Sequence, residues 1–216
     1  MLFFSFCGKN FPAYTVEKNK AEFTLLCLGD SYTIGEAVPV SQSFPFQLLQ
    51  RLKTENIVTN GTYNLVAKTG WTTTELKTAL NQAADTSIYD MVTLLVGANN
   101  IFRNYPVEIY KTEFEQLLQI AIQKTGNRPE RVIVLSIPDY GYTPSGKNNK
   151  AEISAKVNEY NAINELLALQ YGTLYVNITD ISRKGLAQPY LITYDGLHPS
   201  GVMYAEWAAL IAQILE

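Results

Sequence analysis

Short apolar runs alternate with segments of helical period along most of the chain. The run at residues 22–28 is followed by glycine and is typical of a strand that is buried on both faces. Runs of the same character predict further strands over residues 63–67, 91–96, 131–137 and 173–178. Between the strands, a 3.6-residue period predicts helices over residues 44–54, 73–84, 107–124, 150–170 and 200–215.

This alternation predicts an α/β fold, because right-handed crossovers place helices on both faces of a parallel sheet. We expect a three-layer α/β/α, flavodoxin-like domain with a five-stranded parallel sheet in the order 2-1-3-4-5. The chain has 216 residues, which suits one domain over residues 22–216. In such a sheet the active site forms at the carboxyl ends of the strands, so the segments after each strand hold the candidate residues.

Residues 1–21 stand apart from this pattern. Residues 1–8 are apolar and end in Cys7-Gly8, but they lack the basic start and the length of a signal peptide. They are interpreted either as the remnant of a lipoprotein or other signal segment whose start lies upstream, or as a hydrophobic arm that packs on the domain. The two interpretations leave the location open between the cell envelope or periplasm and the cytoplasm, with peripheral or lipid-anchored membrane association in the first case.

Composition narrows the classes of function. The formal net charge of -3 provides no basic face for a nucleic acid. No apolar run reaches about 18 residues, so we expect no transmembrane helix. With one histidine and two isolated cysteines, Cys7 and Cys27, we expect free thiols and neither a zinc cluster nor another cofactor.

Ser31 is the candidate nucleophile, because it follows Gly29 and Asp30 directly after the first predicted strand. A serine at this point faces the crevice and has a backbone N–H that is available as a donor. Gly-Asp-Ser also occurs as an ordinary turn, and Asp30 is suited to capping a helix. Ser31 is therefore a credible nucleophile only if the chain also supplies a base that can accept its proton.

His198 is the candidate base, since a serine hydroxyl near neutral pH needs a neighbour to take its proton. It is the chain's only histidine, the residue type with an unperturbed pKa near ~6.5. Asp195, three residues upstream, can accept from the ring Nδ1–H and so turn Nε2 toward Ser31. A lone histidine is more often structural, but this Asp-x-x-His in a Gly/Pro loop favours a catalytic role.

Acyl transfer also requires donors for the negative charge that develops on the carbonyl oxygen. Gly70 follows the second predicted strand, where a missing side chain lets a backbone N–H approach the substrate. Asn99 follows the third and carries a side-chain N–H. Together with the Ser31 N–H, these groups form the predicted oxyanion hole.

These candidates fall in four ordered sequence blocks: Gly29-Asp30-Ser31-Tyr32, Gly70, Gly97-Ala98-Asn99-Asn100 and Asp195-Gly196-Leu197-His198-Pro199. In order and separation the blocks resemble those of the GDSL, or SGNH, hydrolase family, over residues 24–210. The first block is similar to members labelled lysophospholipase-like.

The resemblance implies a three-layer fold and serine esterase or lipase chemistry. By matching position, it implies Ser31 as nucleophile, Gly70 and Asn99 as oxyanion donors, and Asp195 and His198 as acid and base. Two positions depart from the family pattern. Tyr32 stands where the family name has leucine, and Asn100 stands where the family usually has an aspartate thought to brace the loop.

We therefore expect a carboxylic ester hydrolase that acts on a small-molecule or lipid-like ester through an acyl-enzyme on Ser31. Carbohydrate O-deacetylase, thioesterase and transacylase activities would use the same residues. Outside the enzymes, the alternative is a flavodoxin-like binding protein; a phosphorelay receiver is disfavoured because Asp30 lacks a neighbouring carboxylate. Acyl chain length and oligomeric state stay open. The expected substrate pocket consists of apolar and aromatic side chains at the strand ends: Tyr32, Ile34, Trp71, Phe102, Tyr140, Tyr142 and Leu197.

Overall fold

A five-stranded, all-parallel sheet organises the protein. The computed structural model describes residues 4–6, 9–11, 22–83 and 85–215. Within these, the sheet has the strand order β4-β3-β5-β6-β7, which is 2-1-3-4-5 when its strands are counted along the chain. The predicted topology is confirmed. The strands are β3 (Phe23–Gly29), β4 (Gly61–Ala67), β5 (Met91–Leu95), β6 (Val132–Leu135) and β7 (Leu174–Val176).

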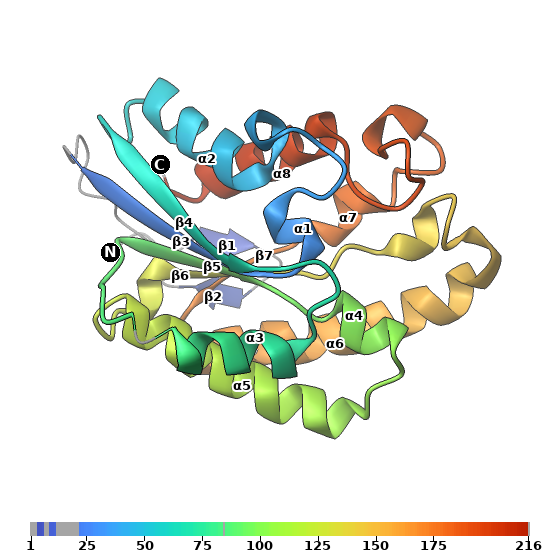
Figure 1. The fold of residues 1–216 in the computed structure, drawn as a ribbon, viewed down its shortest axis with the longest axis horizontal. Coiled ribbons are helices and arrows are strands. Elements are labelled where there is room, and N and C mark those ends of the chain that lie inside the picture. The colour runs from blue at the N-terminus through green and yellow to red at the C-terminus, as the bar shows by residue number, and fades with distance from the viewer. Residues whose placement is uncertain (1–3, 7–8, 12–21, 84, 216) are drawn as a thin grey trace.

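Helices cover both faces of the sheet and complete the predicted three layers (Figure 1). On one face α2 (Phe44–Thr54) packs against α8 (Gly201–Gln213). On the other lie α3 (Thr73–Gln82), α5 (Val107–Lys124) and α6 (Lys150–Tyr171). The shorter helices are α1 (Ser31–Ile34), α4 (Ala98–Phe102), α7 (Thr179–Ser182) and the 3-10 turns η1 (Val40–Gln42), η2 (Pro129–Arg131), η3 (Tyr140–Tyr142), η4 (Lys147–Asn149) and η5 (Pro189–Leu191).

The long helices begin and end where local sequence dictates. α3 starts with a capping box in which Thr72 and Glu75 exchange hydrogen bonds, so two N–H groups that lack helical acceptors are satisfied. α6 ends at Gly172, whose φ of 70° is the left-handed conformation that glycine adopts without strain. The bounds of α2 and α5 match the predicted ranges, and those of α3, α6 and α8 differ by one or two residues.

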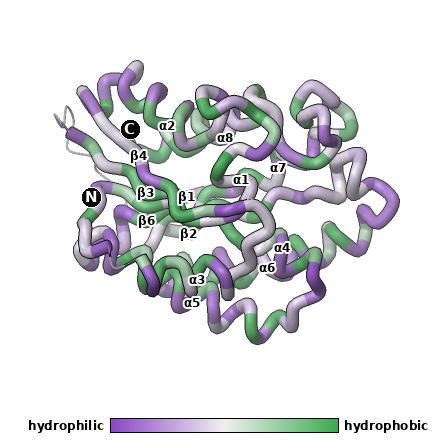
Figure 2. The backbone as a smooth tube through the Cα atoms, viewed as in Figure 1, coloured by the Kyte–Doolittle hydropathy of each residue, from purple (hydrophilic) through white to green (hydrophobic). Residues whose placement is uncertain are grey.

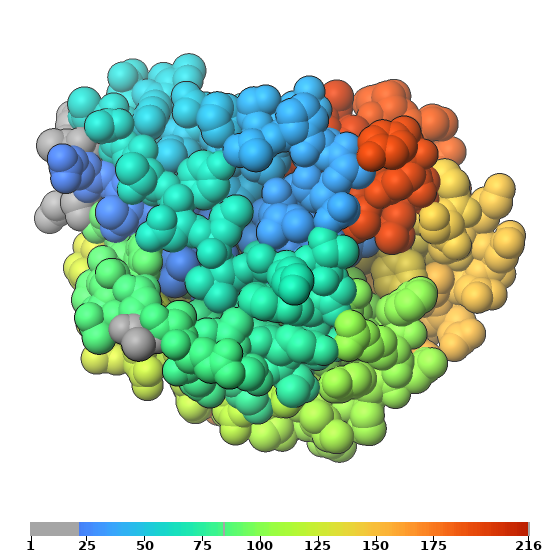
Figure 3. Space-filling model, in the orientation of Figure 1, coloured from blue at the N-terminus to red at the C-terminus, as the bar shows by residue number. Residues whose placement is uncertain are grey.

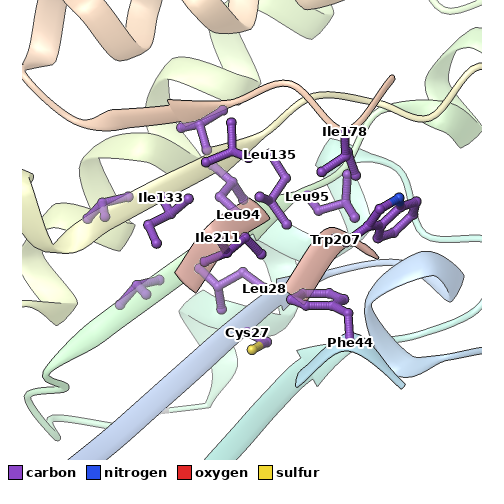
Figure 4. Packing of buried hydrophobic residues seen from close by; sticks show 14 of the residues in the cluster. Cys27, Leu28, Phe44, Leu94, Leu95, Ile133, Leu135, Ile178, Trp207 and Ile211 are labelled. Carbon is purple, nitrogen blue, oxygen red and sulfur yellow. The ribbon is translucent and has the colours of Figure 1, made fainter. Parts of the chain in front are cut away.

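The core lies on both faces of the sheet, against α2 and α8 on one side and α3, α5 and α6 on the other. β5 and β6 are buried along their whole length, and apolar residues follow one another along β3 (Figure 2). Trp207 and Ile211 of α8 pack with Leu28 and Phe44 (Figure 4), and all four side chains are fully buried. Burial of apolar side chains is the main stabilising term in folding. The packing of α8 on the sheet therefore fixes the position of the loop that precedes this helix.

β4 departs from the expectation of a strand buried on both faces. It is an edge strand, paired only with β3, and several of its side chains reach solvent, including Leu65 at 41% exposure. The apolar run at residues 63–67 resembles the central strands in composition. Burial is decided by neighbours on both sides, and β4 has one.

The segment before the main domain is described only in part. β1 (Phe4–Phe6) and β2 (Lys9–Phe11) pair as a small antiparallel sheet. The interpretation of residues 1–21 as an arm or signal remnant, like the expectation for Cys7, falls largely outside the described residues. Cys27 is a buried free thiol, as predicted, and burial raises its pKa to about 12. In the part of the chain that is described, no helix is long and apolar enough to cross a bilayer.

Candidate active site

The carboxyl ends of the parallel strands meet at one edge of the sheet, where α1 and α4 begin (Figure 1). A cavity of about 130 Å³ opens there. It brings together the predicted nucleophile, base and oxyanion side chain, although these are separated by up to 167 positions in the sequence. The lining residues are Ser31, Tyr32, Ala98, Asn99, Phe102, Tyr140, Leu197 and His198.

Ser31 is the first residue of α1. Asp30 caps this helix, with its Oδ1 accepting from the Tyr32 N–H at 3.0 Å. The first N–H groups of a helix have no acceptor within it, so the Ser31 N–H is available as a donor beside its own hydroxyl. The close fit of α1 on β3 requires glycine at position 29, because a Cβ there would collide with Thr33 and with the Leu95 carbonyl.

Asp195 holds His198 in one orientation. Its Oδ2 lies 2.6 Å from the ring Nδ1, and its Oδ1 accepts from the His198 N–H at 3.0 Å and the Leu197 N–H at 2.8 Å. The Thr193 hydroxyl also donates to Oδ1, at 2.7 Å. With Nδ1 engaged by a carboxylate, Nε2 is the ring nitrogen left for a reacting group.

The charge on Asp195 is well supported by these contacts. Burial opposes ionisation of the carboxyl, but the hydrogen bonds from the His198 ring, the backbone N–H groups and Thr193 outweigh it. The pKa of Asp195 is therefore well below its usual value, and the residue acts as an acceptor throughout the neutral range.

The His198 ring packs on Tyr32, the residue that follows Ser31. Its centroid lies 5.5 Å from that of Tyr32, and Tyr32 in turn lies 6.5 Å from Trp207 of α8. Both His198 and Tyr32 are less than 10% exposed. The buried aromatic contacts therefore tie the base to the helix that carries Ser31.

Gly70 and Asn99 occupy adjoining loops. Gly70 has a φ of 82°, a left-handed conformation that disfavours any residue with a side chain, and Arg103 Nη2 donates to its carbonyl at 2.6 Å. Asn99 Nδ2 donates to the Trp71 carbonyl at 3.0 Å and faces Asp30 Oδ2 at 3.4 Å. Gly70 does not itself line the 130 Å³ cavity, but Asn99 joins its loop to the cavity wall.

Asp30 is a buried carboxyl beside this loop. It is 1% exposed, and burial raises its pKa to about 7 although hydrogen bonds from the Tyr32 N–H and Asn99 oppose the rise. This enclosed carboxyl acts as the cap of α1.

The predicted pocket side chains divide into two groups. Tyr32, Phe102, Tyr140 and Leu197 line the cavity with Ser31, whereas Ile34, Trp71 and Tyr142 do not. Trp71 packs on the core, and the Tyr142 ring lies 4.9 Å from Lys150 Nζ. Loop residues carry no periodic pattern, so their sequence does not indicate which way each side chain points.

Comparison with known proteins identifies the family of the chain. The sequence pattern of the GDSL-like lipase/acylhydrolase family matches residues 27–206, most of the chain. The chain belongs to this family. It is a carboxylic ester hydrolase, and the matched range includes every residue of the candidate site.

Solved structures share the GDSL hydrolase fold at low sequence identity. A lipolytic G-D-S-L family protein from Veillonella parvula has 14% identity and a TM-score of 0.72, over 89% of this chain and 97% of that one. A lipase/acylhydrolase from Enterococcus faecalis has 22% identity and a TM-score of 0.69, over 88% and 94%. An acetylxylan esterase from Geobacillus stearothermophilus has 17% identity and a TM-score of 0.68, over 91% and 95%. No curated protein matches the sequence.

Asn100, which stands where the family usually has an aspartate, joins the loops of Gly70 and Asn99 through Thr73. Its Oδ1 accepts from the Thr73 N–H at 3.1 Å, and its Nδ2 donates to Thr73 Oγ1 at 2.8 Å. Thr73 Oγ1 donates its single hydrogen to Glu113 Oε2 at 2.6 Å. Its oxygen can therefore only accept from position 100, and an amide supplies the required donor.

Glu113 carries its charge in this buried cluster. Burial opposes ionisation, but hydrogen bonds from Thr73, Thr74 and Lys77 hold the pKa of its carboxyl below the usual value. An aspartate at position 100 would place a second acceptor against the Thr73 oxygen. Asn100 stands in a recognisable sequence block, but Thr73 and Glu113 do not, because their relation to it depends on contacts between residues 27 and 40 positions apart.

Asn100→Asp is expected to lower the free energy of unfolding by about 2–4 kcal/mol, because one buried hydrogen bond becomes a contact between acceptors. Urea unfolding at pH 8 measures the loss. Glu113→Gln should recover much of it in the double variant, since Thr73 can then donate to position 100. The exposed Asn148→Asp makes the same change of charge and should cost less than 0.5 kcal/mol. A loss equal to that of the control would contradict the role given to Asn100.

Proposed function

We propose that the protein hydrolyses esters through a covalent acyl-enzyme on Ser31, with His198 as general base and acid. The observation that carries the proposal is that Ser31 and the Asp195-bound His198 line the same 130 Å³ cavity. A weak nucleophile beside an oriented base is the arrangement that acyl transfer needs.

In the first half-reaction the Ser31 oxygen attacks the ester carbonyl while His198 Nε2 accepts the hydroxyl proton. The C=O π bond opens and its charge collects on the oxygen, where the N–H groups of Ser31 and Gly70 stabilise it, together with the Asn99 amide hydrogen that leaves its 3.4 Å contact with Asp30 Oδ2. The carbonyl then re-forms, the bond to the alcohol oxygen breaks, and His198 returns the proton to the leaving alcohol.

In the second half-reaction a water molecule takes the place of the alcohol. His198 accepts one of its protons, the hydroxide attacks the acyl carbon, and the Ser31 oxygen leaves with the proton that His198 returns. Asp195 stabilises the imidazolium that forms twice per cycle and fixes the tautomer that accepts the proton. These steps need no metal ion or organic cofactor.

The substrate is proposed to be a small or lipid-like carboxylic ester. O-deacetylation of a carbohydrate is the second candidate, favoured by the likeness in fold to an acetylxylan esterase. Thioesters and acyl transfer to alcohols use the same catalytic groups. Rates on acetyl to palmitoyl esters, with a lysophospholipid, an acetylated sugar and an acyl thioester included, would rank them.

The acyl-enzyme is tested by trapping with hydroxylamine. Acetate esters of p-nitrophenol, phenol and ethanol should all give the same ratio of acetohydroxamate to acetate, because a common intermediate does not retain its leaving group. The products can be measured colorimetrically and by chromatography. A ratio that changes with the leaving group would contradict the covalent mechanism.

A further inference from the structure

A second cavity, of about 290 Å³, adjoins the one that holds Ser31. The two share three lining side chains, Phe102, Tyr140 and Leu197. The loop before α8, the segment leading into α6 and the turn after α4 meet at this end of the molecule (red, yellow-orange and light green in Figure 3). The second cavity is therefore next to the place where the carbonyl of an ester would lie beside Ser31.

The second cavity is more polar than the first. Apart from the three shared side chains, and from Ile101, Gly146 and Ile153, the residues that line the second cavity are polar. They come from the turn after α4, the loop between η3 and η4, and the first turns of α6: Asn104, Ser145, Asn149, Glu152 and Lys156. The loop that carries Ser145 is fixed to the catalytic loop, because the Ser145 N–H donates to the Gly196 carbonyl at 3.0 Å. The polar wall is thus held in place relative to His198.

Charge within the second cavity is balanced. Lys156 Nζ donates to Asn104 Oδ1 at 2.6 Å and lies 3.3 Å from Glu152 Oε1, so the cation has a carboxylate partner. The Asn149 side chain makes no capping bond to α6, although it precedes the helix. The cavity therefore offers amide, hydroxyl and ammonium donors together with amide, hydroxyl and carboxylate acceptors, without an excess of either charge.

This donor and acceptor set fits hydroxyl groups, which both donate and accept. An alkyl chain would remove water from the polar wall without replacing its hydrogen bonds, and that loss disfavours it. An anionic ligand would face Glu152, and a cationic ligand would face Lys156. Phe102 and Tyr140 supply apolar surface against the carbon skeleton of the ligand.

We propose that the second cavity is a specificity subsite for a hydroxyl-rich part of the ester, a polyol or sugar unit, recognised by Asn149 and Lys156. The proposal rests on the proposed function, since it assumes that the ester reacts at Ser31. The hydroxylated unit belongs either to the alcohol or to the acyl side, because both extend from the same carbonyl carbon.

Two matched substrate pairs test the subsite and separate the two sides. 6-O-acetylglucose against hexyl acetate varies the alcohol, and methyl gluconate against methyl hexanoate varies the acyl group. The wild-type kcat/KM should favour the hydroxylated member about tenfold in one pair, and that pair identifies the side that enters the cavity. Lys156→Met and Asn149→Leu should each reduce that preference severalfold. Lys147→Met makes the same change at an exposed lysine outside the cavity and should keep the wild-type ratio.

The proposal is overturned if neither pair shows a preference, or if both variants keep the wild-type ratio. It is also overturned if kcat/KM rises steadily from acetyl to octanoyl p-nitrophenyl esters and rises further in Lys156→Met, since the cavity would then hold an alkyl chain. Ser31→Ala distinguishes failure of the subsite from failure of the proposed function. If that variant still hydrolyses these esters, the chemistry assigned to Ser31 is at fault, whatever the substrate preference.

Discussion

Ser31→Ala is expected to lower kcat for p-nitrophenyl acetate by about 10⁵- to 10⁶-fold. The substitution removes the oxygen that forms the acyl-enzyme, while the backbone N–H and the Asp30 cap that start α1 are kept. Binding and the remaining oxyanion donors account for the residual rate. Initial rates with purified protein measure the change, and a melting curve shows whether the fold is kept.

Ser41→Ala is the matched control, because Ser41 is exposed in η1 and lies outside the cavity. It should retain the wild-type kcat. If Ser31→Ala kept more than about one hundredth of the wild-type rate, another group would have to be the nucleophile, and the acyl-enzyme on Ser31 would be wrong.

Asp195→Asn is expected to lower kcat by about 10⁴-fold with a small change in KM. An amide at this position can still accept from the Leu197 and His198 N–H groups through its oxygen, so the loop keeps its shape. Its NH₂ group, however, would face the ring Nδ1 and favour the tautomer with hydrogen on Nε2. That nitrogen could then no longer accept the proton of Ser31. Steady-state kinetics at pH 8 measure the effect.

Asp180→Asn provides the control for Asp195→Asn, because Asp180 is exposed at the start of α7. Its kcat should stay within twofold of the wild type. A loss of less than tenfold in Asp195→Asn would indicate that the carboxylate is not what orients His198.

Much of the fold was predictable, because the period of apolar residues determines the strands and helices and their order along the chain determines the fold class. The five strands and five long helices follow from patterns several residues long, and the crossover rule then limits the strand order. The helices α1, α4 and α7 are four or five residues long, too short to show a period. β4 was predicted as a strand, but its exposure depends on its place at the sheet edge.

The candidate site was predictable in part. Ser31 and Asn99 directly follow strands, and parallel strands end at one edge of the sheet. The Asp195–His198 pair lies in the loop before α8 and was found because it holds the chain's only histidine. The relation between Asn100, Thr73 and Glu113 could not, since it depends on which hydroxyl donates to which acceptor. The second cavity was also missed: its polar wall comes from a loop and one face of α6, neither of which carries a recognisable motif.

Labelling with a fluorophosphonate tests whether Ser31 is the group that becomes acylated. Peptide mass spectrometry of the labelled protein should find one phosphonyl group per chain, on Ser31. Ser31→Ala should carry none, and Asp195→Asn should react far more slowly. An adduct on another residue, or an unlabelled protein that still hydrolyses esters, would contradict the account.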